Sequence, residues 1–152
     1  MNNTTPHSRD LRSGRASEPE RIYLITCVTD RRRPVFADWR CGRLLVHVLM
    51  KEQQRAATLA YVVMPDHLHW LMQLKEDMAL DKVMRGVKGI SGYRINKLLS
   101  RSGRFWQTGY HDRALRTTDN LVASARYVVA NPLRAGLVAH IGDYPLWDAV
   151  WL

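Results

Sequence analysis

The sequence has few cysteines, a shortage of acidic residues and no long apolar run. Its two cysteines, Cys27 and Cys41, are too few for a disulfide framework or a cysteine-only zinc site, and they favour a reducing compartment. No apolar run has the length that a membrane span requires. No apolar stretch follows the arginines near the N-terminus, as it would in a signal peptide. We therefore expect a cytoplasmic protein that does not insert into a membrane.

The shortage of acidic residues leaves the chain strongly basic. Its 152 residues include 14 Asp and Glu against 23 Lys and Arg, which gives a formal net charge of +9. This excess favours a polyanionic partner, most simply a nucleic acid, although a basic soluble protein without such a partner can have the same composition. The length suits one domain. Residues 1–20 are polar without an apolar period, so we expect a flexible basic arm there and a single domain over residues 21–152.

Two hydrophobic periodicities alternate along this domain. Runs of β-branched and aromatic residues predict strands, and apolar residues at helical spacing predict amphipathic helices. We expect strands over residues 22–29, 58–63, 67–73 and 112–116, and helices over residues 38–56, 77–99 and 119–131. Asp38 is the expected N-cap of the first helix, and Thr117 or Thr118 that of the last. The order predicts an α+β fold: a ferredoxin-like sandwich whose antiparallel sheet has helices on one face, with an additional C-terminal helix carrying Tyr127.

Two histidines flank one apolar residue in the run His67-Leu68-His69, directly after the turn Pro65-Asp66. Side chains two residues apart on a strand point to the same face, so the histidines should project together while Leu68 enters the core. Two imidazoles on a stiff backbone form half of a metal site. A pair of histidines without a ligand is the alternative.

The last predicted helix carries a polar stripe beside its apolar face. Asn120, Ser124, Tyr127 and Asn131 recur at helical spacing, so the phenol of Tyr127 lies among polar residues rather than in the core. Asn131 follows one turn later, at the helix end that Pro132 enforces. An amide oxygen is a suitable ligand for a hard divalent cation, and the helix C-terminus favours positive charge. An ordinary surface tyrosine is the alternative for Tyr127.

Several basic residues are candidates for contacts to phosphates. Three arginines follow the first predicted strand, and others lie on the second helix and the last strand: Arg31, Arg32, Arg33, Lys88, Arg113 and Arg116. Solvated turns and helix faces are the competing interpretation. The aromatic pair Phe105-Trp106 lies beside arginines, as in proteins that stack on unpaired bases, but for Trp106 we favour a core position.

Taken together, these residues resemble the HUH single-tyrosine transposases, which are named for two histidines flanking a bulky apolar residue. Further runs resemble one branch, the REP-associated tyrosine transposases. These runs cover residues 63–69, 105–113, 127–138 and 143–145, and the similarity extends from Ile22 to Trp147. The segment Asn-Pro-Leu-Arg-Ala-Gly-Leu-Val over residues 131–138 is the most specific of them. The ending over residues 146–152 departs from the serine-rich ending expected for this branch.

The resemblance implies an endonuclease and strand transferase for single-stranded DNA with hairpin-forming repeats. A divalent ion, Mg²⁺ or Mn²⁺, would be held by His67, His69 and Asn131, and the hydroxyl of Tyr127 would form a 5′-phosphotyrosine intermediate. The enzyme would associate with the bacterial nucleoid when bound to DNA. Members of this family act as monomers or homodimers, and both an autonomous transposase and a domesticated host protein fit the sequence.

Two other classes of function compete with the transposase. The first is a non-catalytic ferredoxin-like module that binds DNA or RNA hairpins. The second is a metal-dependent nuclease that uses water, which would retain its activity without Tyr127. A rival nucleophile is Tyr110, although it precedes a strand and lacks an asparagine four residues later.

Overall fold

The fold is built on a five-stranded antiparallel sheet. The computed structural model describes residues 21–75, 77–116 and 120–151. The strand order is β4-β1-β3-β2-β5, and the first four strands of this order form the ferredoxin-like arrangement. The strands are β1 (Ile22–Val28), β2 (Ala56–Met64), β3 (His67–Leu74), β4 (His111–Ala114) and β5 (Trp147–Ala149). The predicted α+β fold class is therefore confirmed.

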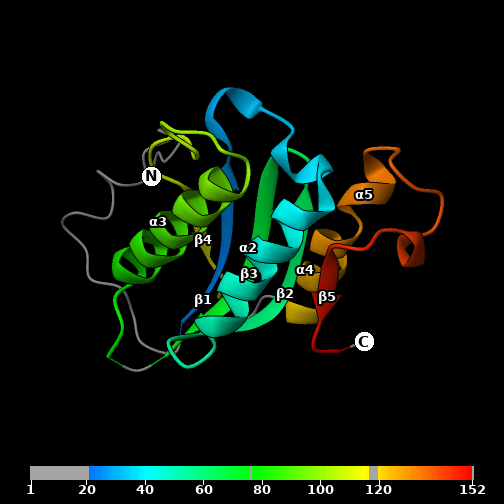
Figure 1. Ribbon diagram of the computed structural model, residues 1–152. Helices are drawn as coiled ribbons and strands as arrows, with labels where there is room; N and C mark the ends of the chain where they lie inside the picture. The colour runs from blue at the N-terminus through cyan, green and yellow to red at the C-terminus, as the bar shows by residue number, and fades with distance from the viewer. Residues whose placement is uncertain (1–20, 76, 117–119, 152) are drawn as a thin grey trace.

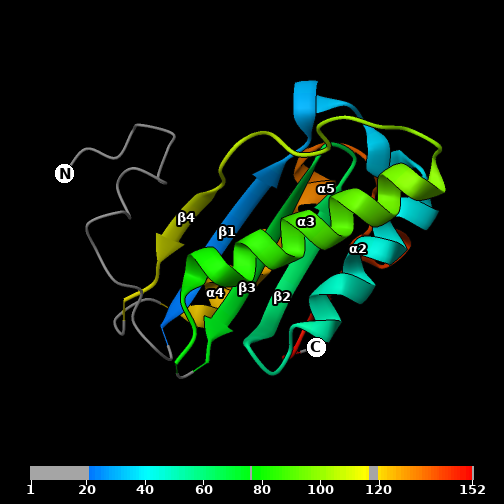
Figure 2. The ribbon, with the colours of Figure 1, turned by 60° about the vertical axis from the view of Figure 1, so that its left-hand side comes forward.

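Helices cover both faces of the sheet. One face carries α2 (Trp39–Lys51) and α3 (Leu80–Leu98), whereas α4 (Leu121–Val129) packs on the other (Figures 1 and 2). The short helix α5 (Asn131–Arg134) lies at the end of the sheet where β2 turns into β3. The described residues also form three 3₁₀ helices: η1 (Asp30–Arg32), η2 (Val35–Ala37) and η3 (Ile141–Asp143).

Side chains that alternate along each strand contribute to the apolar cores on the two faces of the sheet. On β1, Tyr23, Ile25 and Cys27 join the large core beneath α2 and α3. The residues between them point toward α4, where smaller apolar clusters form around Leu71 and Val62. Because β1 and β3 are covered on both faces, each is rich in apolar residues throughout. The central hairpin is thereby held between two helical layers.

Several predicted boundaries need correction. The helix capped by Asp38 ends at Lys51, because Ala56 already belongs to β2. Helix α3 begins at Leu80 rather than Asp77, whose φ of 67° lies in the left-handed region and is incompatible with a right-handed helix. The last predicted helix is two helices, since α4 ends at Val129 and a separate helix starts at Asn131.

Other differences concern the caps and the C-terminal segment. The side chain of Asn120 caps α4 by accepting a hydrogen bond from the backbone N–H of Ala123. The threonines predicted as caps, at 117 and 118, and the predicted arm over residues 1–20 lie outside the described residues. Strand β5 was not predicted; it adds a fifth strand beside β2.

The aromatic pair after α3 is part of the core. Phe105 and Trp106 are buried, and Nε1 of Trp106 donates a hydrogen bond to Oγ of Ser91 on α3 at 3.0 Å. Both rings also pack against Phe36. The core position expected for Trp106 is thus confirmed, and neither ring is open for stacking on a base.

Among the helices in the described part of the chain, none combines the length and the apolar character needed to cross a membrane.

Candidate active site

The two histidines of the HUH-like run lie side by side on the sheet face that α4 covers. Leu68 between them is fully buried in the opposite core, whereas both imidazoles are half-buried. The ring centroids of His67 and His69 are 4.7 Å apart, with the rings nearly perpendicular. The prediction that they project together from one strand is confirmed. Their strand, β3, is the central strand of the sheet, so the backbone that carries them is stiff.

Each imidazole is anchored through Nδ1. Nδ1 of His67 donates to Oδ1 of Asp66 at 2.6 Å, and Nδ1 of His69 lies 3.0 Å from Oγ1 of Thr26, on β1. In the tautomer in which Nδ1 donates the bond, to the Asp66 carboxylate or to Oγ1 of Thr26, Nε2 of the ring carries the lone pair that can bind a metal ion. Protein-bound metals are commonly held by histidines oriented by such hydrogen bonds. The histidine pair thus fits a divalent cation.

The neighbourhood of His69 disfavours its protonation. Burial, the charge of His67 and the charge of Arg134 lower the pKa of His69 to about 4. A metal ligand must be neutral, so this environment keeps His69 in its ligating form at neutral pH. The pKa of Asp66 is also lowered, because hydrogen bonds and charges from His67 and Arg32 outweigh its desolvation. An ionised Asp66 is the form that holds the ring of His67.

Asn131 has the chemistry of a third ligand. It is half-buried at the start of α5, and its Nδ2 donates a hydrogen bond to the backbone carbonyl of Val128 at 2.8 Å. With Nδ2 used in this bond, Oδ1 is the atom of the amide that could act as a ligand. No group of three or more His, Cys, Asp and Glu side chains with metal-binding geometry occurs among residues 21–75, 77–116 and 120–151. An asparagine is not among those four residue types, so the set of two histidines and one amide remains consistent with that finding.

Tyr127 is exposed on the helix that covers this face. It lies on α4 with 62% of its surface accessible, and it lines a shallow pocket with Leu24, Ser124 and Arg113. The rival nucleophile Tyr110 is buried instead, and its hydroxyl donates a hydrogen bond to Oδ1 of Asp81 at 2.6 Å. A phenol held in this way is poorly placed to attack an external phosphate.

The predicted phosphate-binding residues fall into two groups. Arg31, Arg32, Arg113 and Arg116 are exposed, whereas Arg33 is partly buried. Arg32 forms an ion pair with Asp66 at 3.1 Å, and Arg33 pairs with Asp30 at 3.5 Å. The positive charge after β1 therefore lies next to the carboxylate that anchors His67.

Lys88 differs from the exposed arginines because its ammonium forms hydrogen bonds to the protein backbone. Nζ donates hydrogen bonds to the backbone carbonyls of Gln107 and Gly109. These bonds connect α3 to the loop that leads into β4, which indicates a structural role.

Three residues beside the site were not singled out by the sequence. Asp66 and Thr26 orient the imidazoles, and Arg134 lies over the ring of Tyr127. Asp66 could have been found, because it directly precedes His67. The partners Thr26 and Arg134 depend on strand register and on the break between α4 and α5, which no local pattern showed.

Both the sequence and the fold of this chain are similar to those of known transposases. Residues 19–131 match the sequence profile of a family described as IS200-like transposases. A Haemophilus influenzae protein provisionally named a REP-associated tyrosine transposase is 26% identical over 135 residues, which cover 82% of this chain and 77% of that protein.

Two solved structures share the fold. One is a REP-associated tyrosine transposase bound to a REP hairpin, with a TM-score of 0.70, 21% identity, and coverage of 86% of this chain and 77% of that one. The other is a candidate transposase from Deinococcus radiodurans, with a TM-score of 0.52, 19% identity, and coverage of 72% and 88% respectively.

Proposed function

Because the chain belongs to the family of IS200-like transposases, we propose that it cuts and rejoins single-stranded DNA through a covalent bond to Tyr127. The observation that supports this most strongly is the arrangement on one sheet face. Two histidines lie side by side there, each with Nδ1 hydrogen-bonded, and the helix that covers the same face carries an exposed tyrosine. A module that only binds DNA has no use for this combination.

His67, His69 and Asn131 are the residues that would hold a divalent ion, Mg²⁺ or Mn²⁺. When bound, such an ion polarises the scissile phosphate and neutralises the charge that develops on it. The amide oxygen of Asn131 suits these hard cations, and Thr26 and Asp66 hold the two imidazoles in place.

The hydroxyl of Tyr127 would carry out the nucleophilic step. Its oxygen attacks phosphorus and loses its proton, while the bond from phosphorus to the 3′ oxygen breaks and that oxygen gains a proton. The products are a 5′-phosphotyrosine and a strand with a free 3′-OH. Attack of a 3′-OH on the phosphotyrosine reverses the step, so one site serves for both cutting and joining.

We propose hairpin-forming repeat DNA as the substrate. The structural neighbour with a TM-score of 0.70 is bound to a REP hairpin, and the curated relative from Haemophilus influenzae bears the name of the same branch. The net charge of +9 suits such a polyanion. Arg31, Arg113 and Arg116 are exposed candidates for phosphate contacts. Arg32 and Arg33 could add to them from the same turn, while we assign Lys88 chiefly to the fold.

A denaturing gel tests the proposal directly. Labelled single-stranded hairpin DNA is incubated with Mn²⁺ and with the wild-type protein, the Tyr127→Phe variant or the Tyr93→Phe variant. Tyr93 is a matched control, because it is 67% exposed on α3 and also has a cation, Lys97, near its ring. We expect a protein–DNA adduct with wild type and Tyr93→Phe, and none with Tyr127→Phe or with EDTA.

Two other results would replace the proposal. Cleavage without an adduct, unchanged by Tyr127→Phe, would identify a hydrolytic nuclease. Binding without cleavage across hairpins from the host genome would identify a non-catalytic module.

A further inference from the structure

Arg134 holds the candidate nucleophile at two points. Its guanidinium carbon lies 3.9 Å from the centroid of the Tyr127 ring, and its Nη2 donates a hydrogen bond to the backbone carbonyl of the same tyrosine at 2.7 Å. The first contact is a cation–π interaction with the ring face. The second fixes the guanidinium relative to the backbone that carries the ring. Together they restrict a side chain that is otherwise largely exposed.

The break between α4 and α5 produces this geometry. Tyr127 is on α4, and Arg134 is the last residue of α5, seven positions later. In one continuous helix, residues seven apart lie two turns from each other and their side chains lean the same way. Helix α4 ends at Val129 and α5 starts at Asn131, before Pro132, so the contact between Arg134 and Tyr127 spans this break.

We propose that Arg134 is a positioning residue, which holds the Tyr127 ring in the orientation for attack on the scissile phosphate. This inference rests on the proposed function, since it assigns a role within that site. A planar guanidinium can lie flat on the ring while it donates to the carbonyl, which the ammonium of a lysine cannot do in the same way. The inference therefore predicts a requirement for arginine and not for positive charge alone.

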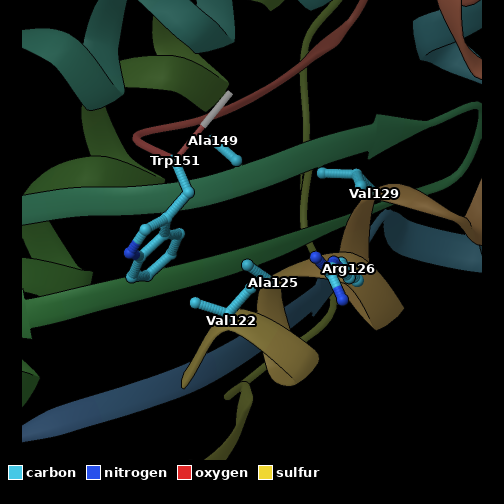
Figure 3. A pocket seen from close by; sticks show the side chains of 6 residues that line it. All are labelled: Val122, Ala125, Arg126, Val129, Ala149 and Trp151. Carbon is cyan, nitrogen blue, oxygen red and sulfur yellow. The ribbon is translucent and has the colours of Figure 1, made fainter. Parts of the chain in front are cut away.

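Arg126 provides a matched control on the same helix. It directly precedes Tyr127 and is exposed, but it lies beside an apolar pocket formed with Val122, Ala125, Val129, Ala149 and Trp151 (Figure 3). Removal of its charge changes the net charge of the protein by the same amount as removal of Arg134. A difference between the two variants thus reports position and not total charge.

The kinetic test is single-turnover adduct formation with Mn²⁺ over a range of hairpin DNA concentrations. For Arg134→Ala we expect the plateau rate to fall about 10- to 100-fold, with the DNA concentration for half that rate changed less than about threefold. Arg134→Lys should stay close to Arg134→Ala, and Arg126→Ala close to wild type. Thermal unfolding of each variant verifies that it is folded. A wild-type plateau rate in Arg134→Ala, full rescue by lysine, or a loss confined to DNA affinity would overturn the inference.

A spectroscopic test needs neither DNA nor activity. The protein is labelled with 3-fluorotyrosine, and the ¹⁹F signal of Tyr127 is assigned from its disappearance in Tyr127→Phe. We expect that signal to shift in Arg134→Ala and to stay in place in Arg126→Ala. An unchanged signal in Arg134→Ala would overturn the contact. If the signal shifts but the wild-type protein forms no adduct with any hairpin, the proposed function fails while the contact stands.

Discussion

Thr26 and His69 face each other across two central strands. They are directly opposite in the antiparallel register of β1 and β3, and Oγ1 of Thr26 lies 3.0 Å from Nδ1 of His69. Opposite residues in such a pair have side chains close enough to interact. The sheet register itself therefore orients one of the two imidazoles.

This relationship predicts the effect of Thr26→Val on metal binding. Valine has nearly the same shape but cannot hydrogen-bond to Nδ1, so we expect the affinity for Mn²⁺ to fall about 10- to 100-fold. Thr26→Ser keeps the hydroxyl and should bind Mn²⁺ nearly as well as wild type. Isothermal titration calorimetry measures both. Equal affinities of the valine variant and wild type would show that Thr26 does not orient a metal ligand.

Two glycines on α3 should respond differently to alanine. Gly89 is exposed, and a Cβ there would have no heavy atom within 4 Å, whereas a Cβ at Gly92 would lie 3.2 Å from Cβ of Phe105. We expect Gly89→Ala to raise the free energy of unfolding by up to about 1 kcal/mol. Gly92→Ala should lower it by about 1 kcal/mol, because the Cβ of Phe105 moves only with its backbone. Urea denaturation measures both, and a stabilising Gly92→Ala would contradict the packing described between α3 and Phe105.

The buried thiol of Cys27 predicts a pH effect at the alkaline end. Burial raises the pKa of Cys27 from 9.0 to about 12, with a smaller opposing effect from the charge of Lys88. Because the folded protein disfavours the thiolate, the contribution to stability is complete below pH 9 and is lost as the pH rises from 9 toward 12. Cys27→Ser should flatten this decline in unfolding experiments between pH 8 and 11. A decline of the same steepness in both proteins would assign it to other groups.

Substitution of Arg113 should affect DNA binding, whereas substitution of Lys88 should affect the stability of the fold. Arg113 is exposed beside Tyr127, so Arg113→Ala should reduce the slope of log Kd against log salt concentration by about 1. Lys88→Met should leave that slope unchanged and lower the stability by about 1–3 kcal/mol, because two hydrogen bonds to the loop before β4 are lost. Fluorescence anisotropy at several salt concentrations and urea denaturation measure the two quantities. The opposite pattern would make Lys88 the phosphate contact.

Local periodicity was sufficient to predict the four main strands, the two helices on one face and the common direction of His67 and His69. It failed where neighbouring elements determine the structure. Strand β5 has only three residues, and its pairing with β2 is not visible in its own sequence. Helix α3 starts later than expected because Asp77 is in a left-handed conformation, which no propensity for aspartate specifies.

In the candidate site, too, only the features that a local pattern determines could be predicted from the sequence. The stripe on α4 predicted that Tyr127 lies outside the core, and the alternation along a strand predicted that His67 and His69 point the same way. Their roles in a site stay predictions. The contact of Arg134 with Tyr127 spans the break between α4 and α5, so neither helix alone predicts it. The contact of Thr26 with His69 could not be predicted, because the two residues are 43 positions apart in the sequence and meet only through the register of β1 and β3.

The most direct measurement is the identification of the residue that becomes linked to DNA. The adduct formed with Mn²⁺ and hairpin DNA is digested with nuclease and trypsin, and the modified peptide is sequenced by mass spectrometry. The account predicts a 5′-linked nucleotide on Tyr127, in a peptide that ends at Arg134. A nucleotide on Tyr110, in the peptide that ends at Arg113, or an adduct on any other residue would contradict it.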